Sequence, residues 1–280
     1  MGQDWSRWLD EASAADDRPG ARGRGQAGDG DELLPPRPVL VVGGCGGAGT
    51  TTTALGLAGE LGSEVAAVAV DATAAGGDLA LRGADEHLSP ISLQQWLHGR
   101  GDGEPAPLKE CLSQASSGIG LLWRDASPLR RRASYLTVSR AVAEAGWTPV
   151  YDGGSPIAGR QLRPLLEDDE VALVLAIPAR ADAANRLRVT LEWLDDEFGG
   201  QVEGQGGGIV GDTTVVISHQ LPGNDSRVAD HLREHLTGWV RDIREVPYDS
   251  HLARGELVRH NELDVETRRA YRAVVTGMTS

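Results

Sequence analysis

The sequence predicts an α/β protein built on a doubly wound, mostly parallel sheet. Short apolar runs alternate along the chain with stretches of helical periodicity, which is the pattern of consecutive βαβ units. The first apolar run ends in glycines that lead into a run of threonines, as expected where a strand turns into the N-terminus of a helix. Hydrophobic residues make up 40% of the 280 residues, which is enough for one sizeable core.

The predicted elements follow one another from Pro38 to the end of the chain. Apolar runs predict strands at 39–42, 65–70, 171–177, 213–217 and 243–246. Helical spacing of apolar residues predicts helices at 51–61, 181–194, 228–240 and 264–275. Residues 148–154 are a poorer strand candidate, because Thr148 and Pro149 interrupt the apolar run. Glycine dominates 199–211, which we expect to form a loop.

Residues 1–36 differ in composition from residues 37–280, which we expect to form one domain. From residue 11 to residue 36 the chain is mostly Gly, Asp, Arg, Ala and Pro, and only Leu33 and Leu34 offer much apolar surface to bury. A segment of this composition cannot offset the entropy of ordering its backbone. We therefore expect a disordered N-terminal arm.

A short apolar stripe lies near the start of this arm. Trp5, Trp8 and Leu9 are spaced i, i+3, i+4, so on a helix they would share one face. The stripe is either a docking motif for a groove on a partner protein or a short helix that lies on its own domain. A plain tail without a docking role is the third interpretation.

The charge balance, the cysteines and the apolar runs indicate which partners and which compartment to expect. The chain carries 27 basic and 41 acidic residues, a net charge of −14, and this disfavours general binding to nucleic acid. Lys109 is the single lysine. Cys45 and Cys111 are the only cysteines, so the reducing cytoplasm is the expected compartment. No apolar run approaches the length of a membrane span and residues 1–30 contain no signal-peptide core, so we expect no membrane partner.

The first predicted strand leads into a candidate phosphate-binding loop. Residues 43–52 read Gly-Gly-Cys-Gly-Gly-Ala-Gly-Thr-Thr-Thr. Glycines let a backbone fold around an anion with its N–H groups pointing inward. The helix that follows adds the positive end of its dipole. Thr51 falls at the position of the hydroxyl that binds Mg²⁺ in such loops.

On these residues the sequence resembles the MinD/ParA-like ATPases, a deviant class of P-loop proteins. The loop of that family reads K-G-G-x-G-K-T-T-T, and residues 45–53 here read C-G-G-A-G-T-T-T-T. Every glycine and the Mg²⁺-binding Thr51 match. Both lysines are missing. Cys45 replaces the lysine that reaches across the family's dimer to the partner's nucleotide, and Thr50 replaces the Walker A lysine.

The resemblance extends over nearly all of residues 37–280. Residues 70–79 are similar to the family's V-D-x-D-P-x-G-G-D-L, with Asp71 at the first aspartate and Thr73 where the family orients the attacking water. Asp152 follows a segment that resembles a Walker B strand. Ser218 stands where the family has a base-reading asparagine, and residues 246–253 resemble the family's adenine-side loop.

The resemblance implies a site for ATP or ADP with Mg²⁺. Thr51 and Asp152 would hold the ion, and Asp71 is the one remaining catalytic candidate. The nucleotide would contact two loops, which comprise Gly44, Cys45, Gly46, Gly47, Ala48, Gly49, Thr50, Thr51 and Thr52 in the first and Pro247, Tyr248 and Asp249 in the second.

The missing charges predict a degenerate member of the family. A cation at the γ-phosphate is worth about 10³–10⁵ in the rate of phosphoryl transfer, so we expect little or no hydrolysis. The expected function is that of a pseudo-ATPase that serves as a positioning or regulatory scaffold. Two alternatives stay open, which are a slow ATPase that uses arginine in place of lysine and a pure interaction module with an empty nucleotide site. Candidate arginines for the slow ATPase are Arg124, Arg130, Arg131 and Arg132.

The resemblance also bears on partners. The chain is most similar to MinD-like proteins found beside secretion and conjugation systems of high-GC bacteria, which implies a protein partner. Contact with that partner would be made through Trp5, Trp8 and Leu9 or through Arg130, Arg131 and Arg132. A homodimer is compatible with the resemblance.

One further motif lies outside the phosphate loop. Residues 231–235 read H-L-R-E-H, and His231 and His235 would share a helix face that could hold Zn²⁺. A catalytic zinc also needs a third ligand, and no distinct ligand cluster stands out in the sequence. We therefore expect the motif to be a chance pattern on an exposed helix.

Overall fold

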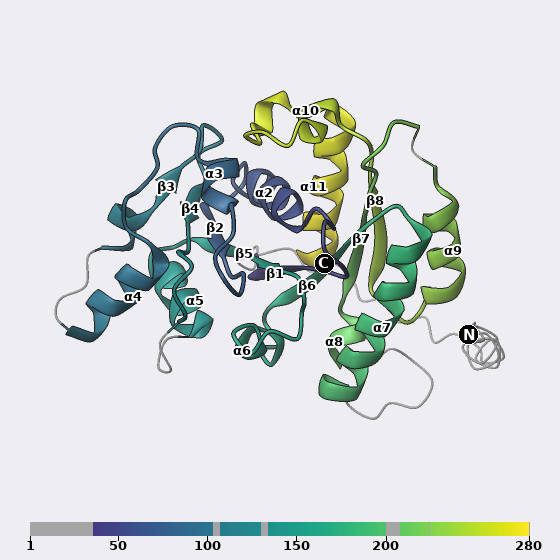
Figure 1. The fold of residues 1–280 in the computed structure, drawn as a ribbon, viewed down its shortest axis with the longest axis horizontal. Helices are drawn as coiled ribbons and strands as arrows, with labels where there is room; N and C mark the ends of the chain where they lie inside the picture. Colours follow the sequence, from purple (N-terminus) through teal and green to yellow (C-terminus); the bar gives the residue numbers. More distant parts are fainter. Residues whose placement is uncertain (1–35, 103–106, 130–133, 200–207, 224, 280) are drawn as a thin grey trace, which may run out of the picture.

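One sheet of eight strands forms the centre of the protein (Figure 1). The structure is a computed structural model that describes residues 36–102, 107–129, 134–199, 208–223 and 225–279. The predictions for the N-terminal arm, for Trp5, Trp8 and Leu9, and for Arg130, Arg131 and Arg132 lie outside these residues.

The strands are arranged in the order β3-β4-β2-β5-β1-β6-β7-β8. Every neighbouring pair is parallel except β3 and β4. The predicted doubly wound, mostly parallel sheet is therefore confirmed. The strands are β1 (Val39–Gly43), β2 (Ala67–Asp71), β3 (Ser113–Gln114), β4 (Gly120–Leu122), β5 (Thr148–Gly154), β6 (Ala172–Pro178), β7 (Thr214–Ser218) and β8 (Asp242–Val246).

Helices cover both faces of the sheet, with α2 and α11 on one face and α5 and α7 on the other (Figure 1). The helices are α2 (Thr50–Leu61), α3 (Leu79–Gly83), α4 (Leu93–Asp102), α5 (Tyr135–Glu144), α6 (Arg163–Leu166), α7 (Ala181–Phe198), α8 (Gly208–Gly211), α9 (Arg227–Leu236), α10 (Ser250–Ala253) and α11 (Val265–Thr279). Two short 3₁₀ turns are η1 (Leu108–Cys111) and η2 (His260–Glu262). None of the described helices combines the length and the apolar character that a bilayer span requires.

The core consists mainly of Val, Leu, Ile and Ala, and every residue of β1 and of β6 is buried. The packing of α2 against α11 is close because α2 carries glycine at the crossing. A Cβ atom at Gly56 would lie 2.4 Å from the ring of Tyr271, which is fully buried on α11. This contact fixes the helix that follows the phosphate loop against the C-terminal helix.

The structure corrects several element boundaries. The poor strand candidate at 148–154 is β5, and it lies at the centre of the sheet between β2 and β1. The predicted helix at 228–240 ends at Leu236, because Gly238 adopts a φ of 88° that ends helical geometry. The expected loop at 199–211 contains the short helix α8. The predicted helix at 264–275 continues as α11 to Thr279.

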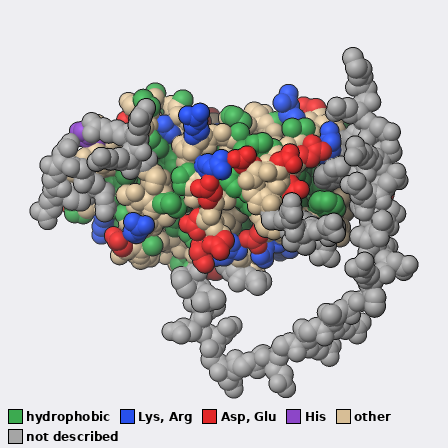
Figure 2. Space-filling view, turned by 90° about the horizontal axis from the view of Figure 1, so that it is seen from below, with side chains coloured by type: hydrophobic (Ala, Val, Ile, Leu, Met, Phe, Trp, Pro, Cys, Tyr) green, Lys and Arg blue, Asp and Glu red, His purple; other side chains and the backbone are tan. Residues whose placement is uncertain are grey.

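The surface seen from below carries both signs of charge. Figure 2 shows acidic side chains interspersed with Lys and Arg on this face. A phosphate backbone is bound by a continuous basic surface, and the described part of this face does not provide one.

Candidate functional site

The phosphate loop joins the end of β1 to the start of α2, at the carboxyl edge of the parallel strands. Gly47 and Gly49 have φ angles of 72° and 81°, which side chains other than glycine rarely adopt. The side-chain amide of Gln220 donates to the Gly47 carbonyl at 2.8 Å. The shape of the loop therefore comes from its glycines and from a tie to the residue two positions after β7.

The structure brings together Thr51 and Asp152, the two residues that the sequence analysis assigned to Mg²⁺. The hydroxyl of Thr51 donates to Asp152 Oδ2 at 2.6 Å. Strand β5 places Asp152 there because it pairs with β1 in parallel register, with Asp152 beside Val41. A threonine hydroxyl and a carboxylate are oxygen donors of the kind that Mg²⁺ takes. The residues present therefore fit the ion.

Asp152 is completely buried. Burial raises the pKa of its carboxyl group to about 6, although the hydrogen bond from Thr51 acts in the opposite direction. A bound divalent cation would favour the ionised form. Burial therefore makes the ionised form of Asp152 unfavourable, and a cation bound beside it would offset that cost.

Asp71, the one catalytic candidate, is hydrogen-bonded to the loop that follows β2. It lies at the end of β2 opposite Asp152. One carboxylate oxygen accepts the backbone N–H and the hydroxyl of Thr73, at 3.0 and 2.6 Å, and the other accepts the Gly77 N–H at 2.7 Å. Burial raises its pKa, and these hydrogen bonds lower it in part. Asp71 thus holds the loop after β2 in place. Neither Asp71 nor Asp152 is among the residues that line the cavity described below.

Arg124 packs behind the same loop. It is only 4% exposed, and its guanidinium donates to the carbonyl of Thr73 and to the hydroxyl of Tyr135, the latter at 3.4 Å. The Tyr135 hydroxyl in turn donates to the Asp71 carbonyl at 3.2 Å. Arg124 therefore supports the loop after β2 and is not among the residues that line the cavity.

A cavity of about 630 Å³ opens beside the phosphate loop. It brings together most of the predicted nucleotide-contacting residues, namely Cys45, Gly46, Gly47, Ala48, Gly49, Thr50, Thr51, Thr52, Pro247, Tyr248 and Asp249. Gly44 is outside the lining, where its N–H donates to the Ala176 carbonyl at 3.0 Å. Ser218 and His219 also line the cavity. The two predicted loops thus face one volume large enough for a small ligand.

Asp249 shapes the second loop. Its carboxylate caps α10 by accepting the N–H groups of His251 and Leu252, at 2.8 and 3.3 Å. The other oxygen accepts the Asp264 N–H at 2.9 Å. Asp249 is 3% exposed. The hydrogen bonds of Asp249 therefore hold the second loop in place. Pro247 and Tyr248, which precede it, also line the cavity.

Arg82 is a site residue that the sequence did not predict. Among the described residues that line the cavity, it is the single Lys or Arg. It lies on α3, where its Nε donates to the Glu256 carbonyl at 2.9 Å and its Nη2 donates to Thr52 Oγ1 at 3.4 Å. The guanidinium thus links the segment after α10 to the first turn of α2. No local motif marks it in the sequence, because it follows the Gly-Gly-Asp-Leu segment within an ordinary short helix.

Comparisons with known proteins locate the fold. No known family profile matches the sequence, and no curated protein matches it either. A ParA family ATPase from Chlorobium tepidum superposes with a TM-score of 0.61 at 16% identity, covering 86% of this chain and 98% of that one. MinD from Pyrococcus furiosus superposes with a TM-score of 0.59 at 15% identity, covering 86% and 98%. The chain has the MinD/ParA-like P-loop fold.

A third relative of this MinD/ParA-like fold was solved with ligands. Cobyrinic acid a,c-diamide synthase from Mycobacterium smegmatis, with a bound ATP analogue and magnesium, superposes with a TM-score of 0.55 at 15% identity, covering 86% of this chain and 93% of that one. At these identities the likeness establishes the fold. What this chain binds has to be argued from its own residues.

Proposed function

We propose that this protein binds a Mg²⁺-nucleotide and acts as a positioning or regulatory scaffold for a partner complex, with little or no ATP hydrolysis. The observation that carries the proposal is a difference between two sides of the cavity, one suited to Mg²⁺ and the other without a lysine for the phosphates. Its Mg²⁺ side keeps Thr51 hydrogen-bonded to Asp152, whereas its phosphate loop has neutral Cys45 and Thr50 where the resembled family has lysines.

The glycine-rich loop supports binding. Its backbone N–H groups and the N-terminus of α2 supply a positive environment for phosphates that does not depend on a lysine. Two of the solved structures with this fold carry an ATP analogue. The loss of one charge-assisted hydrogen bond weakens binding by about 1.5–3 kcal/mol, which leaves room for binding at high nucleotide concentration.

The missing charges argue against fast hydrolysis. Phosphoryl transfer needs a cation at the γ-phosphate and a group that orients the attacking water. Cys45, Thr50 and Thr73 occupy the three positions where the resembled family supplies these groups. A nucleotide bound here would therefore persist, and the bound state would act as a signal for a partner.

Arg82 favours the second candidate function, a slow ATPase. It places one guanidinium on the cavity wall beside Thr52. Arginine binds phosphate oxygens in a bidentate manner, so Arg82 would replace part of the lost lysine charge. Arg82 does not replace the group that orients the water, and so we rank this candidate second. A pure interaction module with an empty site is the third.

The partner of the scaffold is a proposal as well. MinD of Aquifex aeolicus was solved in complex with the cell division protein MinC. We propose that this chain likewise engages a protein, through Trp5, Trp8 and Leu9 or through Arg130, Arg131 and Arg132. A cytoplasmic location, an association with secretion or conjugation systems and a homodimer are parts of the same proposal.

Calorimetric titration tests the binding half of the proposal. The full chain would be titrated with ATP and with ADP, each with Mg²⁺ and with a chelator in its place. We expect saturable binding that depends on Mg²⁺ and that weakens about 10- to 100-fold in the Thr51→Ala variant, because the ion loses a ligand. If neither nucleotide binds at millimolar concentration while the protein is folded, the empty interaction module replaces the proposal.

A further inference from the structure

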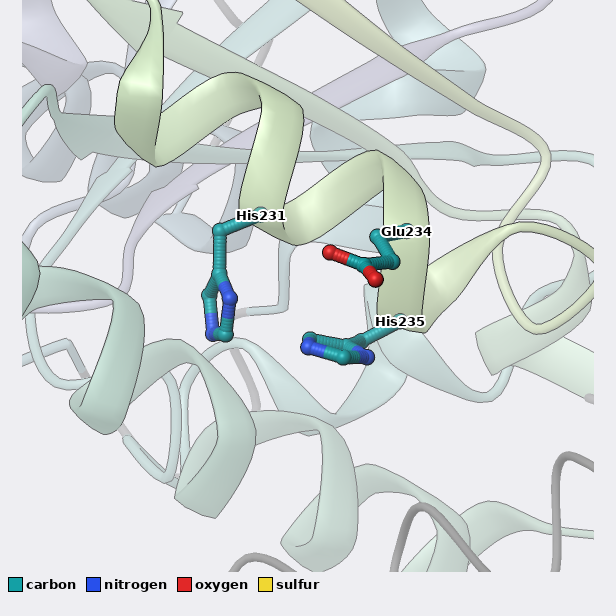
Figure 3. Close-up of side chains that lie close together, drawn as sticks. All are labelled: His231, Glu234 and His235. Carbon is teal, nitrogen blue, oxygen red and sulfur yellow. The ribbon is translucent and has the colours of Figure 1, made fainter.

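Three potential metal ligands come together on α9, on the opposite side of β7 and β8 from α11. Figure 3 shows the side chains of His231, Glu234 and His235 extending from the same side of the helix. One ligand atom from each of the three residues lies within 4.8 Å of the other two. The two imidazole rings lie 4.4 Å apart between centroids, at an angle of 80°. The structure therefore supplies the third ligand that the sequence did not reveal.

The helix presents these side chains because its other side is anchored. Ala229, Leu232 and Leu236 are buried against the sheet. His231 and Glu234 are exposed and His235 is half-buried. In a tetrahedral zinc site with bonds of about 2.0–2.1 Å, ligand atoms lie about 3.3 Å apart. The separation of at most 4.8 Å in the structure is therefore up to about 1.5 Å longer than a zinc site requires.

The surroundings leave the carboxylate of Glu234 available. Among the described residues, no hydrogen bond or ion pair engages the side chain of Glu234, and its negative charge acts on the neighbouring His231 ring. The nearby cation Arg233 is engaged elsewhere, since its Nη2 pairs with Glu245 at 2.8 Å and its Nη1 lies 3.5 Å from Asp230. Two neutral imidazoles and one carboxylate give the cluster a net negative charge, which favours a cation.

We propose that His231, Glu234 and His235 bind one Zn²⁺ ion on the surface of α9. Two imidazole nitrogens and one carboxylate oxygen suit Zn²⁺, whereas Mg²⁺ and Ca²⁺ take oxygen ligands. The fourth coordination position is open to water. His231 also lines a groove of about 610 Å³ between α7 and α9. The site lies at the surface, so the assignment is metal binding and not hydrolysis.

The test is a titration of the metal-free full chain with Zn²⁺ in competition with a chromophoric chelator. We expect one ion per chain with a dissociation constant near or below about 10 µM. The His231→Ala and His235→Ala variants should each weaken binding at least tenfold, and Glu234→Gln should weaken it about three- to tenfold. All three side chains are exposed or half-buried, and a thermal melt of each variant verifies folding.

Two control variants separate this site from other donors. His87→Ala removes an exposed imidazole elsewhere in the chain, and Cys45→Ser removes the thiol of the phosphate loop. Both should bind Zn²⁺ as the parent does. The proposal is overturned if the parent binds no Zn²⁺ at 100 µM, or if His231→Ala and His235→Ala leave the affinity unchanged. Neither result would bear on nucleotide binding, which the Thr51→Ala titration tests separately.

Discussion

The two sides of the cavity beside the glycine-rich loop differ in the side chains they offer. On the side proposed to hold Mg²⁺, the Thr51 hydroxyl and Asp152 Oδ2 lie 2.6 Å apart. On the phosphate side, Cys45 and Thr50 offer no charge, and both are buried within the loop. The difference shows that the shape of a phosphate loop and its charge are separate properties of the sequence.

The shape survives because it is tied to the fold. Gly47 and Gly49 need their positive φ angles for the chain to pass from β1 into α2, and a Cβ atom at Gly43 would lie 2.7 Å from Thr50 Oγ1. Substitution at such positions strains the backbone or the packing. A lysine side chain at the Thr50 position would have no comparable role in folding, so the loop can keep this shape without one. The predictions below test whether the two sides are separable in this way.

The largest effect is expected from restoring charge to the phosphate side. The Thr50→Lys substitution places an ammonium group in a loop of unchanged shape. We expect Mg-ATP to bind about 10- to 150-fold more tightly, which corresponds to one charge-assisted hydrogen bond of about 1.5–3 kcal/mol. Paired calorimetric titrations of parent and variant at one salt concentration measure the gain.

A matched variant controls for the added charge itself. Thr276→Lys adds the same side chain on an exposed face of α11. The adjacent Gly277 carbonyl accepts from Arg241 at the start of β8, which is the sheet edge opposite the phosphate loop. This control should leave the affinity unchanged. An unchanged affinity in the folded Thr50→Lys protein would mean that the loop no longer receives phosphates.

The Mg²⁺ side is tested through its buried carboxyl group. The pKa of Asp152 is raised from 3.8 to about 6, first by burial. Between these two values the unfolded chain releases its proton before the folded chain does, so stability falls as the pH rises and stays low above pH 6. From pH 5 to pH 7.5 this group should cost the metal-free protein about 1–1.5 kcal/mol of unfolding free energy.

The Asp152→Asn variant isolates that cost, because it lacks the titrating group and keeps an oxygen that can accept from Thr51. Urea unfolding of both proteins at pH 5 and pH 7.5, without Mg²⁺, measures the difference. We expect the parent to lose about 1–1.5 kcal/mol more than the variant over this range. Equal losses in the two proteins would contradict a raised pKa at Asp152.

The smallest effect concerns Arg82, the cation that remains on the cavity wall. Arg82→Gln should weaken Mg-ATP binding about three- to fivefold, because a partly exposed guanidinium adds only a modest attraction. Arg269→Gln on α11 is the matched control. Arg269 is exposed, pairs with Glu266 three residues before it, and does not line the cavity. Equal affinities for the two variants would remove Arg82 from the site and with it the case for a slow arginine-assisted ATPase.

Local patterns allowed much of the fold and of the site to be predicted from the sequence. The glycine-rich turn between β1 and α2 carries its own signal, whereas Asp152 was assigned only through the resemblance to the family's Walker B strand. No element was predicted in residues 79–144, which contain the ten-residue helices α4 and α5 as well as shorter elements. There β3 spans two residues and β4 spans three, which is too few to show a period. Pro149 concealed β5, although it lies near the start of that strand and is tolerated there.

Two residues that the sequence did not single out, Arg82 and Glu234, depend on the three-dimensional structure for their positions. Arg82 reaches the cavity only because α3 lies beside α2 and beside the segment that contains Glu256. The position of Glu234 beside the two histidines depends on side-chain directions that spacing alone leaves open. Asp71 was predicted as a catalytic candidate, and its hydrogen bonds to Thr73 and Gly77, which come from the turn after β2, were not foreseen.

The central claim is that the cavity holds nucleotide without consuming it. A single-turnover experiment tests this most directly. Excess protein is mixed with Mg²⁺ and ATP labelled in the γ-phosphate, and the bound fraction is recovered and analysed over several hours, with Thr51→Ala as the binding-deficient control. We expect the parent to retain label as intact ATP, with release of phosphate no faster than in the Thr51→Ala sample. Conversion of bound ATP to ADP within minutes, abolished by Thr51→Ala, would contradict the account.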